Sequence, residues 1–309
     1  MKPEILVIAG PTASGKTALG IEMALRLNGE IISADSMQIY KGMDIATAKP
    51  TAEEMSRVQH HLIGFLDRSE NFSVADYVKL ASEKADDIIS RGKVPVVVGG
   101  TGLYISSFVN NIQFPDIKND EKVRERLRRE ASEFGNELLL ERLRKCDPET
   151  ASILHANNLG RIIRALEVFE VTGRKLSEYK RESTLVESPY KFTTVALTYD
   201  DRQVLYDRIN KRVDFMMEKG LVDEAYEIFM ERDSIGTAHQ AIGCKELAPY
   251  FEKKASLDEC VEKIKQETRR YAKKQLTWLR KEPDINWIEG SCESDINFFI
   301  KKCENLIAK

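Results

Sequence analysis

The residue pattern with the clearest chemistry lies at positions 10–17, where the sequence is Gly-Pro-Thr-Ala-Ser-Gly-Lys-Thr. This is the pattern G-x-x-x-x-G-K-[ST], whose backbone N–H groups wrap around phosphate oxygens. It follows an apolar run at 5–9 and precedes a helix-like segment at 18–27, the context that such a P-loop needs. We therefore predict a cradle for a phosphate or diphosphate, to which Lys16 adds a positive charge and Thr17 a hydroxyl for a phosphate-bound Mg²⁺. A glycine-rich turn without a ligand is the alternative.

Two further polar side chains follow apolar runs that are expected to form buried strands. Asp35 ends the segment 29–35, and Thr101 follows 94–98 within Gly99-Gly100-Thr101-Gly102. A carboxylate beside a phosphate loop suits general-base catalysis or Mg²⁺ coordination, and capping of the next turn is the structural alternative. The glycines around Thr101 predict a close approach of a ligand to the backbone, unless they only allow a tight turn. The second run ends in glycine where an ordinary P-loop NTPase has a metal-binding Asp, which counts against a plain ATPase.

Basic residues cluster at three places. Arg161 and Arg164 lie three residues apart, and Arg208 and Arg212 lie four apart, so each pair shares one face of an expected helix. The segment 269–281 contains six Lys or Arg residues, two aromatic residues and no acidic residue. Cations neutralise phosphates and aromatic rings stack on unpaired bases, a combination that binds single-stranded RNA loops. A solvated basic face is the alternative at each place.

Alternating strand and helix patterns predict an α/β fold in the first part of the chain. The strands have few polar interruptions, which is typical of a parallel sheet flanked by helices on both faces. Because ligands bind at the carboxyl ends of such strands, we expect residues 10–17, Asp35 and Thr101 to surround one crevice. The expected elements are strands at 5–9, 29–35 and 94–98 and helices at 18–27 and 73–91.

From about residue 114 the pattern becomes helical, and a strand at 192–198 returns the chain to the sheet. We therefore predict a P-loop core formed by 1–112 and 190–309, with a helical C-terminal part, and an all-helical insertion at 113–189. The helices expected in the insertion cover 119–146, a segment that opens at 147–150, and 158–172. Those expected after it lie at 201–219, 221–232, 240–252 and 256–281, followed by a strand at 285–288 and a helix from 295.

The composition limits the class of protein. The chain has 309 residues, 31% charged and 42% hydrophobic, with a formal net charge of −3. These values are typical of a soluble globular protein, and no segment is long and apolar enough for a signal peptide or a membrane span. The five scattered cysteines favour free thiols in a reducing cytoplasm over disulfides or a zinc site. We expect the paired residues His60 and His61 to pack and to hydrogen-bond, since no third metal ligand lies near them.

Taken together, these segments resemble the bacterial tRNA dimethylallyltransferases, also called tRNA isopentenyltransferases. The resemblance extends over nearly the whole chain, at 10–17, 35–40, 42–45, 47–50, 60–63, 99–104, 147–148, 161–168, 241–243 and 270–280. Its departures are local: Ala156, Asn158 and Gly160 stand where the family usually has Pro, Asp and Gln, Cys244 where an aromatic residue is common, and Gly64 where an acid often follows the histidines.

The resemblance implies transfer of a dimethylallyl group from dimethylallyl diphosphate to the N6 amine of adenosine 37 in tRNA, with release of diphosphate. It implies a monomeric cytoplasmic enzyme with Mg²⁺ as cofactor and no membrane partner. Asp35 would be the general base, Thr101 would position a substrate, and Lys16 would stabilise the leaving group. Thr17 would hold the metal. The diphosphate would be bound by Gly10, Pro11, Thr12, Ala13, Ser14, Gly15, Lys16 and Thr17, with Arg208 and Arg212.

The same resemblance implies that the helical insertion and the segment 269–281 grip the anticodon stem-loop. The residues expected to contact tRNA are Asp35, Ser36, Met37, Gln38, Thr101, Arg124, Arg161, Arg164, Gln240, Lys245, Lys273, Lys274, Trp278 and Arg280. Three other functions would also account for the P-loop: a small-molecule kinase, an isopentenyltransferase acting on free adenine nucleotides, and a non-catalytic nucleotide-binding module.

Overall fold

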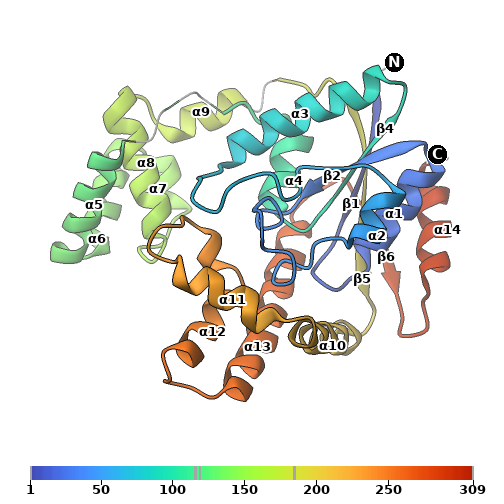
Figure 1. Cartoon of the computed structure of the whole chain (residues 1–309). Helices are drawn as coiled ribbons and strands as arrows, with labels where there is room; N and C mark the ends of the chain where they lie inside the picture. The colour runs from blue at the N-terminus through green and yellow to red at the C-terminus, as the bar shows by residue number, and fades with distance from the viewer. Residues whose placement is uncertain (1, 115–116, 118–119, 184–185, 308–309) are drawn as a thin grey trace. The chain divides into compact units, whose positions relative to one another are not determined.

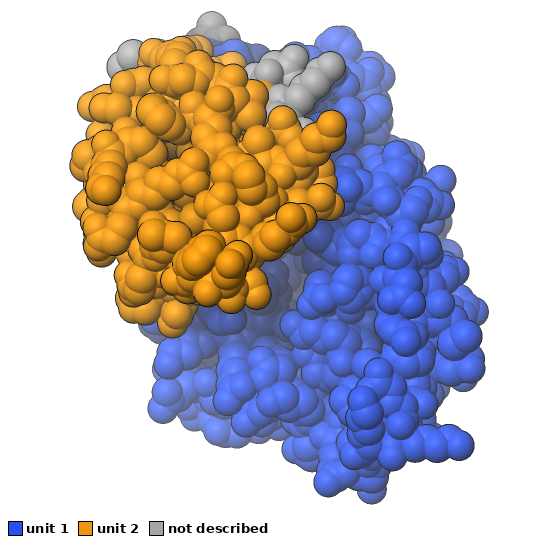
Figure 2. Space-filling view, turned by 90° about the vertical axis from the view of Figure 1, so that its left-hand side faces the viewer, with its two compact units in different colours: residues 1–109, 189–309 blue, residues 110–188 orange. Residues whose placement is uncertain are grey.

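The computed structural model describes residues 2–114, 117, 120–183 and 186–307. The chain forms two compact units, coloured separately in Figure 2. The first consists of Met1–Val109 with Pro189–Lys309, and the second of Asn110–Ser188. The sequence places these boundaries at 113 and 189, and the binding of tRNA by the second unit stays a prediction.

Within the described residues, six parallel strands form one sheet in the order β3-β2-β4-β1-β5-β6 (Figure 1). The predicted α/β class with a parallel sheet is therefore confirmed. Ala9 of β1 and Ala34 of β2 are both aligned with Gly99 of β4, so these three strands end at the same level. The strands are β1 (Glu4–Ala9), β2 (Gly29–Ala34), β3 (His60–His61), β4 (Val94–Gly99), β5 (Lys191–Tyr199) and β6 (Ile285–Gly290).

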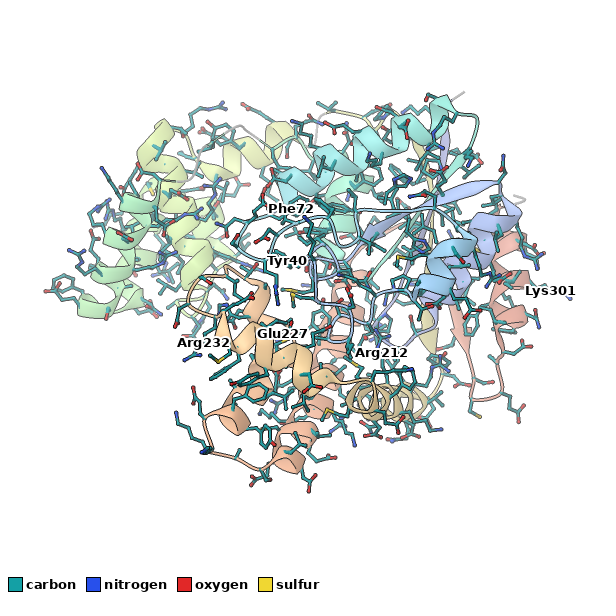
Figure 3. The ribbon with its side chains drawn as sticks, viewed as in Figure 1. Tyr40, Phe72, Arg212, Glu227, Arg232 and Lys301 are labelled. Carbon is teal, nitrogen blue, oxygen red and sulfur yellow. The ribbon has the colours of Figure 1, made fainter. Side chains whose placement is uncertain are left out.

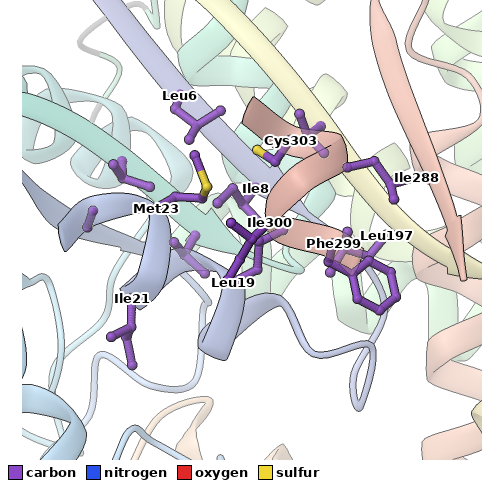
Figure 4. Close-up of a cluster of buried hydrophobic side chains, with 14 of the residues drawn as sticks. Leu6, Ile8, Leu19, Ile21, Met23, Leu197, Ile288, Phe299, Ile300 and Cys303 are labelled. Atoms are coloured by element: carbon purple, nitrogen blue, oxygen red, sulfur yellow. The ribbon is translucent and has the colours of Figure 1, made fainter. Parts of the chain in front are cut away.

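Helices cover both faces of the sheet, which explains why its central strands are mostly apolar. On one face, α1 (Lys16–Arg26) and α14 (Ile296–Ile307) enclose the cluster shown in Figure 4, to which Leu6, Leu19 and Phe299 belong. On the other face lie α3 (Val74–Ser90) and α4 (Gly102–Val109). Ser73 caps α3 in a capping box with Asp76, at the start of the helix predicted at 73–91.

The C-terminal part of the first unit is helical, with its own buried cluster that includes Tyr40, Val213 and Leu247. The predicted helix at 240–252 begins only at Cys244, because Gln240 belongs to a short 3-10 turn and Gly243 has a φ of 103°. The elements are α10 (Arg202–Glu218), α11 (Leu221–Met230), η1 (Ala238–Gln240), α12 (Cys244–Phe251) and α13 (Leu257–Leu279). Among the helices of the described residues, none combines the length and apolar character that crossing a membrane requires.

The second unit is helical throughout its described residues and has a core of leucine and isoleucine. Its dense charges are largely paired: Arg126 and Arg142 each form ion pairs with both Glu130 and Glu170. Gly173 ends α8 in the left-handed conformation, as its position after the helical pattern predicts. The helices are α5 (Glu121–Phe134), α6 (Asn136–Cys146), α7 (Pro148–Ser152), α8 (Leu159–Thr172) and α9 (Leu176–Ser183).

Four short elements were not predicted: β3, α2 (Ala52–Arg57), α4 and α9. The two histidines of β3 hydrogen-bond as expected, His60 Nδ1 with the carbonyl of Val58 and His61 Nε2 with the buried carboxylate of Glu30. Arg91 and Lys93 also pair with Glu30. The Arg91 hydrogen bond, opposed by burial, holds the pKa of Glu30 far below its ordinary value of 4.5.

Glu30→Gln should lower the free energy of unfolding at pH 7 by about 2 kcal/mol, because it weakens charge-assisted bonds in a buried position. The lowered pKa contributes stability above pH 4.5 that is lost as the pH falls further, so the difference should shrink at pH 3.5. Urea unfolding followed by the fluorescence of Trp278 and Trp287 reports on the first unit only. Glu4→Gln is the control, since the Glu4–Lys191 pair is exposed. An equal loss in both variants would contradict the prediction.

Candidate active site

A crevice of about 310 Å³ opens at the carboxyl ends of β1, β2 and β4. It brings together many of the residues that the sequence selects, from segments far apart in the chain. Those that line it are Thr12, Lys16, Thr17, Asp35, Ser36, Met37, Gln38, Arg212, Gln240, Lys245 and Lys274. Selected residues of the same unit that do not line it are Gly10, Pro11, Ala13, Ser14, Gly15, Thr101, Arg208, Lys273, Trp278 and Arg280.

Loop 10–17 has the conformation of an anion cradle. Ala13 and Gly15 have positive φ values of 62° and 94°, and α1 begins directly after Gly15. Gly15 provides no side-chain cap, so the amides of the first helical turn are available to an anion. The hydroxyl of Ser14 is buried and has no hydrogen-bond partner among the described residues. The loop therefore holds unpaired donors in the place where a phosphate is expected.

Lys16 and Arg212 are the two cations of the crevice that interact with Asp35. The pKa of Lys16 is lowered to about 8, mainly by burial and also by the nearby Arg212, while Asp35 partly opposes this shift. Burial also lowers the pKa of Arg212, which lies on α10 (Figure 3), and Asp35 again opposes this shift. Burial makes these two positive charges unfavourable unless a negative charge lies nearby. A bound anion would therefore be strongly stabilised in the crevice.

Arg208 lies on α10 like Arg212 but does not line the crevice. Its Nε donates to the carbonyl of Ala13 at 2.8 Å, and its guanidinium lies 5.4 Å from the ring centre of Tyr199. The Tyr199 hydroxyl in turn donates to the carbonyl of Ser14. Arg208 thus stabilises loop 10–17 through the carbonyl of Ala13, and its direct contact with a diphosphate stays a prediction.

Asp35 lines the crevice and also caps a turn. Its Oδ1 accepts hydrogen bonds from the amides of Met37 at 2.9 Å and Gln38 at 3.3 Å. The structural alternative considered for Asp35 is therefore present. Within the described residues, Oδ2 has no hydrogen-bond partner. One oxygen orients the carboxylate, and the other is available for chemistry.

Protein neighbours explain the glycines around Thr101. A Cβ on Gly99 would lie 2.2 Å from the carbonyl oxygen of Ala34, and one on Gly100 would lie 2.2 Å from Nε2 of Gln275. The close approach that we expected from a ligand is thus made by β2 and α13. Thr101 Oγ1 accepts a hydrogen bond from the amide of Ser36 at 3.0 Å, which joins the loops that follow β4 and β2.

Glu224 was not identified from the sequence, yet it fixes a wall of the crevice. Its carboxylate accepts hydrogen bonds from the consecutive amides of Asp44, Ile45 and Ala46, at 2.7–2.8 Å. Ala46 lines the crevice. These hydrogen bonds join Glu224 to a segment far away in the sequence, so no local sequence pattern predicts them. Tyr271 and Gln275 were missed for another reason: they lie in the segment 269–281, where we considered only contacts with RNA.

The basic segment on α13 has two faces. Ala272, Gln275 and Leu279 are buried, whereas Lys273 and Lys274 are exposed. A second, shallower groove is lined by Arg270, Lys273, Lys274, Thr277, Trp278 and Lys281. Lys274 lines both this groove and the crevice. Lys274 therefore joins the basic groove on α13 to the crevice.

In the second unit, Arg124 and Arg164 both pair with Glu167, which is fully buried. These ion pairs hold the pKa of Glu167 below its ordinary value although burial opposes them. Arg161 is exposed. The alternative for Arg161 and Arg164 was a basic face exposed to solvent. Arg164 does not fit it, because it pairs with a buried carboxylate.

The donor set of the crevice fits Mg²⁺ bound mainly through a ligand. The described residues contain no group of three His, Cys, Asp or Glu side chains that could hold a metal by themselves. Thr17 and Asp35 line the same crevice. Mg²⁺ keeps several waters and takes one or two protein ligands together with substrate phosphates, so a hydroxyl and one carboxylate are sufficient.

Comparisons with known proteins agree with this geometry. The family model for IPP transferase matches residues 38–282. The tRNA dimethylallyltransferase of Acetivibrio thermocellus is 50% identical over 285 residues, which cover 92% of this chain and 91% of the relative. That of Halalkalibacterium halodurans is 44% identical over 308 residues, 100% of this chain and 98% of the relative.

Solved structures give the same result. The tRNA isopentenylpyrophosphate transferase from Bacillus halodurans is similar with a TM-score of 0.73 and 43% identity, over 100% of this chain and 96% of that one. A eukaryotic dimethylallyltransferase acting on tRNA has a TM-score of 0.80 and 30% identity, over 93% of this chain and 74% of that one. The chain therefore belongs to the IPP transferase family, whose members are the tRNA dimethylallyltransferases.

Proposed function

We propose that the chain transfers a dimethylallyl group from dimethylallyl diphosphate to the exocyclic N6 amine of adenosine 37, next to the anticodon of tRNA. The observation that carries the proposal is one crevice in which an anion cradle, two cations and the carboxylate of Asp35 meet. The cradle suits the diphosphate, and the carboxylate suits the acceptor amine.

The crevice also has an apolar wall for the prenyl chain. Ile31, Val98, Val213 and Met216 line it, on the same crevice as Lys16. Burying a five-carbon chain against such side chains contributes about 0.8 kcal/mol for each methylene equivalent. The prenyl chain of dimethylallyl diphosphate has no polar group, so an apolar wall on the crevice of Lys16 suits it throughout its length.

In the proposed reaction, the bond between C1 of the dimethylallyl group and the diphosphate oxygen breaks, and a bond between C1 and N6 forms. The diphosphate leaves with the electron pair, and the proton of N6 goes to Oδ2 of Asp35. Lys16, Arg212 and the amides of loop 10–17 stabilise the charge that develops on the leaving group. Thr17 would hold Mg²⁺, which supplies further positive charge to the diphosphate when bound.

The acceptor base must leave its stack to enter the crevice, as in other enzymes that modify bases. We propose that the groove on α13, the second unit and the crevice residues Ser36, Met37 and Gln38 bind the anticodon stem-loop. The groove favours RNA over free adenine nucleotides as acceptor, because its cations Arg270, Lys273 and Lys281 do not line the crevice and a mononucleotide bound there would leave them unused.

The proposal is tested with labelled dimethylallyl diphosphate and two synthetic anticodon stem-loops that differ only at position 37. A stem-loop with adenosine should gain one prenyl group and release one diphosphate. A stem-loop with inosine, which has an oxygen in place of the N6 amine, should gain none. Equal labelling of both would contradict transfer to N6 of that residue.

Lys273→Ala should weaken binding of the stem-loop and lower the slope of log Kd against log salt by about one unit, because one phosphate contact releases about one counterion. Lys301→Ala is the matched control, an exposed lysine on α14 (Figure 3). Fluorescence anisotropy from 50 to 200 mM salt, without donor, measures the slope. If both variants keep the wild-type slope, the groove on α13 is only a solvated face.

A further inference from the structure

Three side chains of α13 contact the loops that form the crevice. Tyr271, Gln275 and Trp278 are spaced four and three residues apart and therefore lie on one face of the helix. Tyr271 interacts with Thr101, and the ring of Trp278 covers Gly102 so closely that a Cβ there would be 2.4 Å from it. This face of α13 therefore packs against the loop at Gly99–Gly102, and the groove lined by Lys273 lies on the same helix.

Gln275 makes the polar contacts of this face. Its side chain is only 5% exposed. Oε1 accepts a hydrogen bond from the amide of Thr12 at 2.9 Å, and Nε2 donates to the carbonyl of Gly100 at 2.9 Å. One amide side chain thus ties together loop 10–17, the loop that carries Thr101, and α13.

We propose that Gln275 is a positioning residue for the transfer reaction, which holds the diphosphate loop and the Thr101 loop at a fixed separation from the helix that binds RNA. This inference rests on the proposed function. Glutamine suits the task because it offers a donor and an acceptor at once, and both are used. Without it, the carbonyl of Gly100 would lose its partner in a buried position and the amide of Thr12 in a partly buried one, and the loops would move to regain them.

The first test replaces Gln275 with Met, which has a similar length and cannot make either bond. We expect the single-turnover rate at saturating substrates to fall about 10- to 100-fold, since small displacements of reacting groups are costly. The Kd for the stem-loop should stay within about twofold, because the exposed cations of α13 are unchanged. Gln266→Met, on an exposed position of the same helix, should behave as the wild type.

The second test replaces Gln275 with Glu. An ionised Glu accepts from Thr12 but repels the carbonyl of Gly100, whereas a protonated Glu donates to it and so reproduces both bonds of glutamine. Position 275 is buried, so the pKa of the introduced carboxyl should be raised well above its ordinary value, into this pH range. The ratio of the Gln275→Glu rate to the wild-type rate should therefore rise at least fivefold from pH 8 to pH 6, while the ratio for Gln275→Met stays flat. Dividing by the wild-type rate removes the contribution of the other ionisable groups of the crevice, which are Lys16, Asp35, His60, Arg212, Lys245, Glu267, Tyr271 and Lys274.

Thermal unfolding is measured for each variant at each pH. A Gln275→Met protein that is folded and transfers at the wild-type rate would overturn the inference, as would a Gln275→Glu ratio that does not change with pH. A wild-type protein that forms no prenylated RNA would instead contradict the proposed function. In that case the role of Gln275 is decided by binding of inorganic diphosphate, which Gln275→Met should weaken about tenfold and which an unchanged Kd would refute.

Discussion

Asp35→Asn should lower the single-turnover rate of prenyl transfer by about 10²–10⁴-fold, the usual contribution of a general base. The change keeps the oxygen that accepts the amides of Met37 and Gln38, so the turn after β2 should be preserved. It removes only the ability of the second oxygen to take a proton. The Kd values for donor and for stem-loop should therefore change little.

Two comparisons separate the roles that Asp35 could have. Asp35→Ala loses the cap as well as the base, so its extra effect on thermal stability measures the cap alone. If Asp35 served only to hold Mg²⁺, the Asn variant would bind dimethylallyl diphosphate more weakly, and added Mg²⁺ would restore the rate. Such a recovery in single-turnover experiments over a range of Mg²⁺ concentrations would remove Asp35 from the role of base.

Lys16→Met should reduce the rate of the chemical step by about 10²–10³-fold, equivalent to about 3–4 kcal/mol of transition-state stabilisation. The charge of Lys16 acts on the leaving diphosphate in a partly buried crevice, where water screens it less than in bulk solvent. Lys211→Met, which removes an exposed lysine of α10, is the control and should leave the rate unchanged. A Lys16→Met enzyme with less than a threefold loss would exclude this lysine from leaving-group stabilisation.

The pKa of about 8 for Lys16 adds a pH dependence to donor binding. A bound diphosphate favours the protonated amine, so binding takes up a proton wherever the free protein has lost it. The Kd for dimethylallyl diphosphate, measured without RNA, should therefore be flat below pH 8 and rise about tenfold per pH unit above it. Lys16→Met should remove this rise.

The features that could be predicted from the sequence are those set by local patterns. The apolar runs of β1, β2 and β4 form the predicted parallel sheet, and their common end brings loop 10–17 and Asp35 to one crevice. The start of α3 follows from Ser73 and Asp76, since a capping box is a signal of four consecutive residues.

The features that could not be predicted depend on contacts between distant segments. The hydrogen bond between Gln275 and Thr12 joins residues 263 positions apart. The carboxylate of Glu224 on α11 likewise accepts hydrogen bonds from the distant amides of Asp44 to Ala46. The glycines after β4 were interpreted as room for a ligand because the sequence does not show that α13 fills that space. The strand β3 has only two residues, which is too short for any period to be visible.

The most direct test of the account is a single assay with labelled dimethylallyl diphosphate and four conditions: unmodified tRNA, AMP, no acceptor, and ATP in place of the prenyl donor. The account predicts rapid labelling of tRNA with stoichiometric release of diphosphate, and neither labelling of AMP nor hydrolysis of ATP at a comparable rate. Labelling of AMP in preference to tRNA would assign the crevice to free nucleotides. ATP turnover without prenyl transfer would contradict the proposed donor.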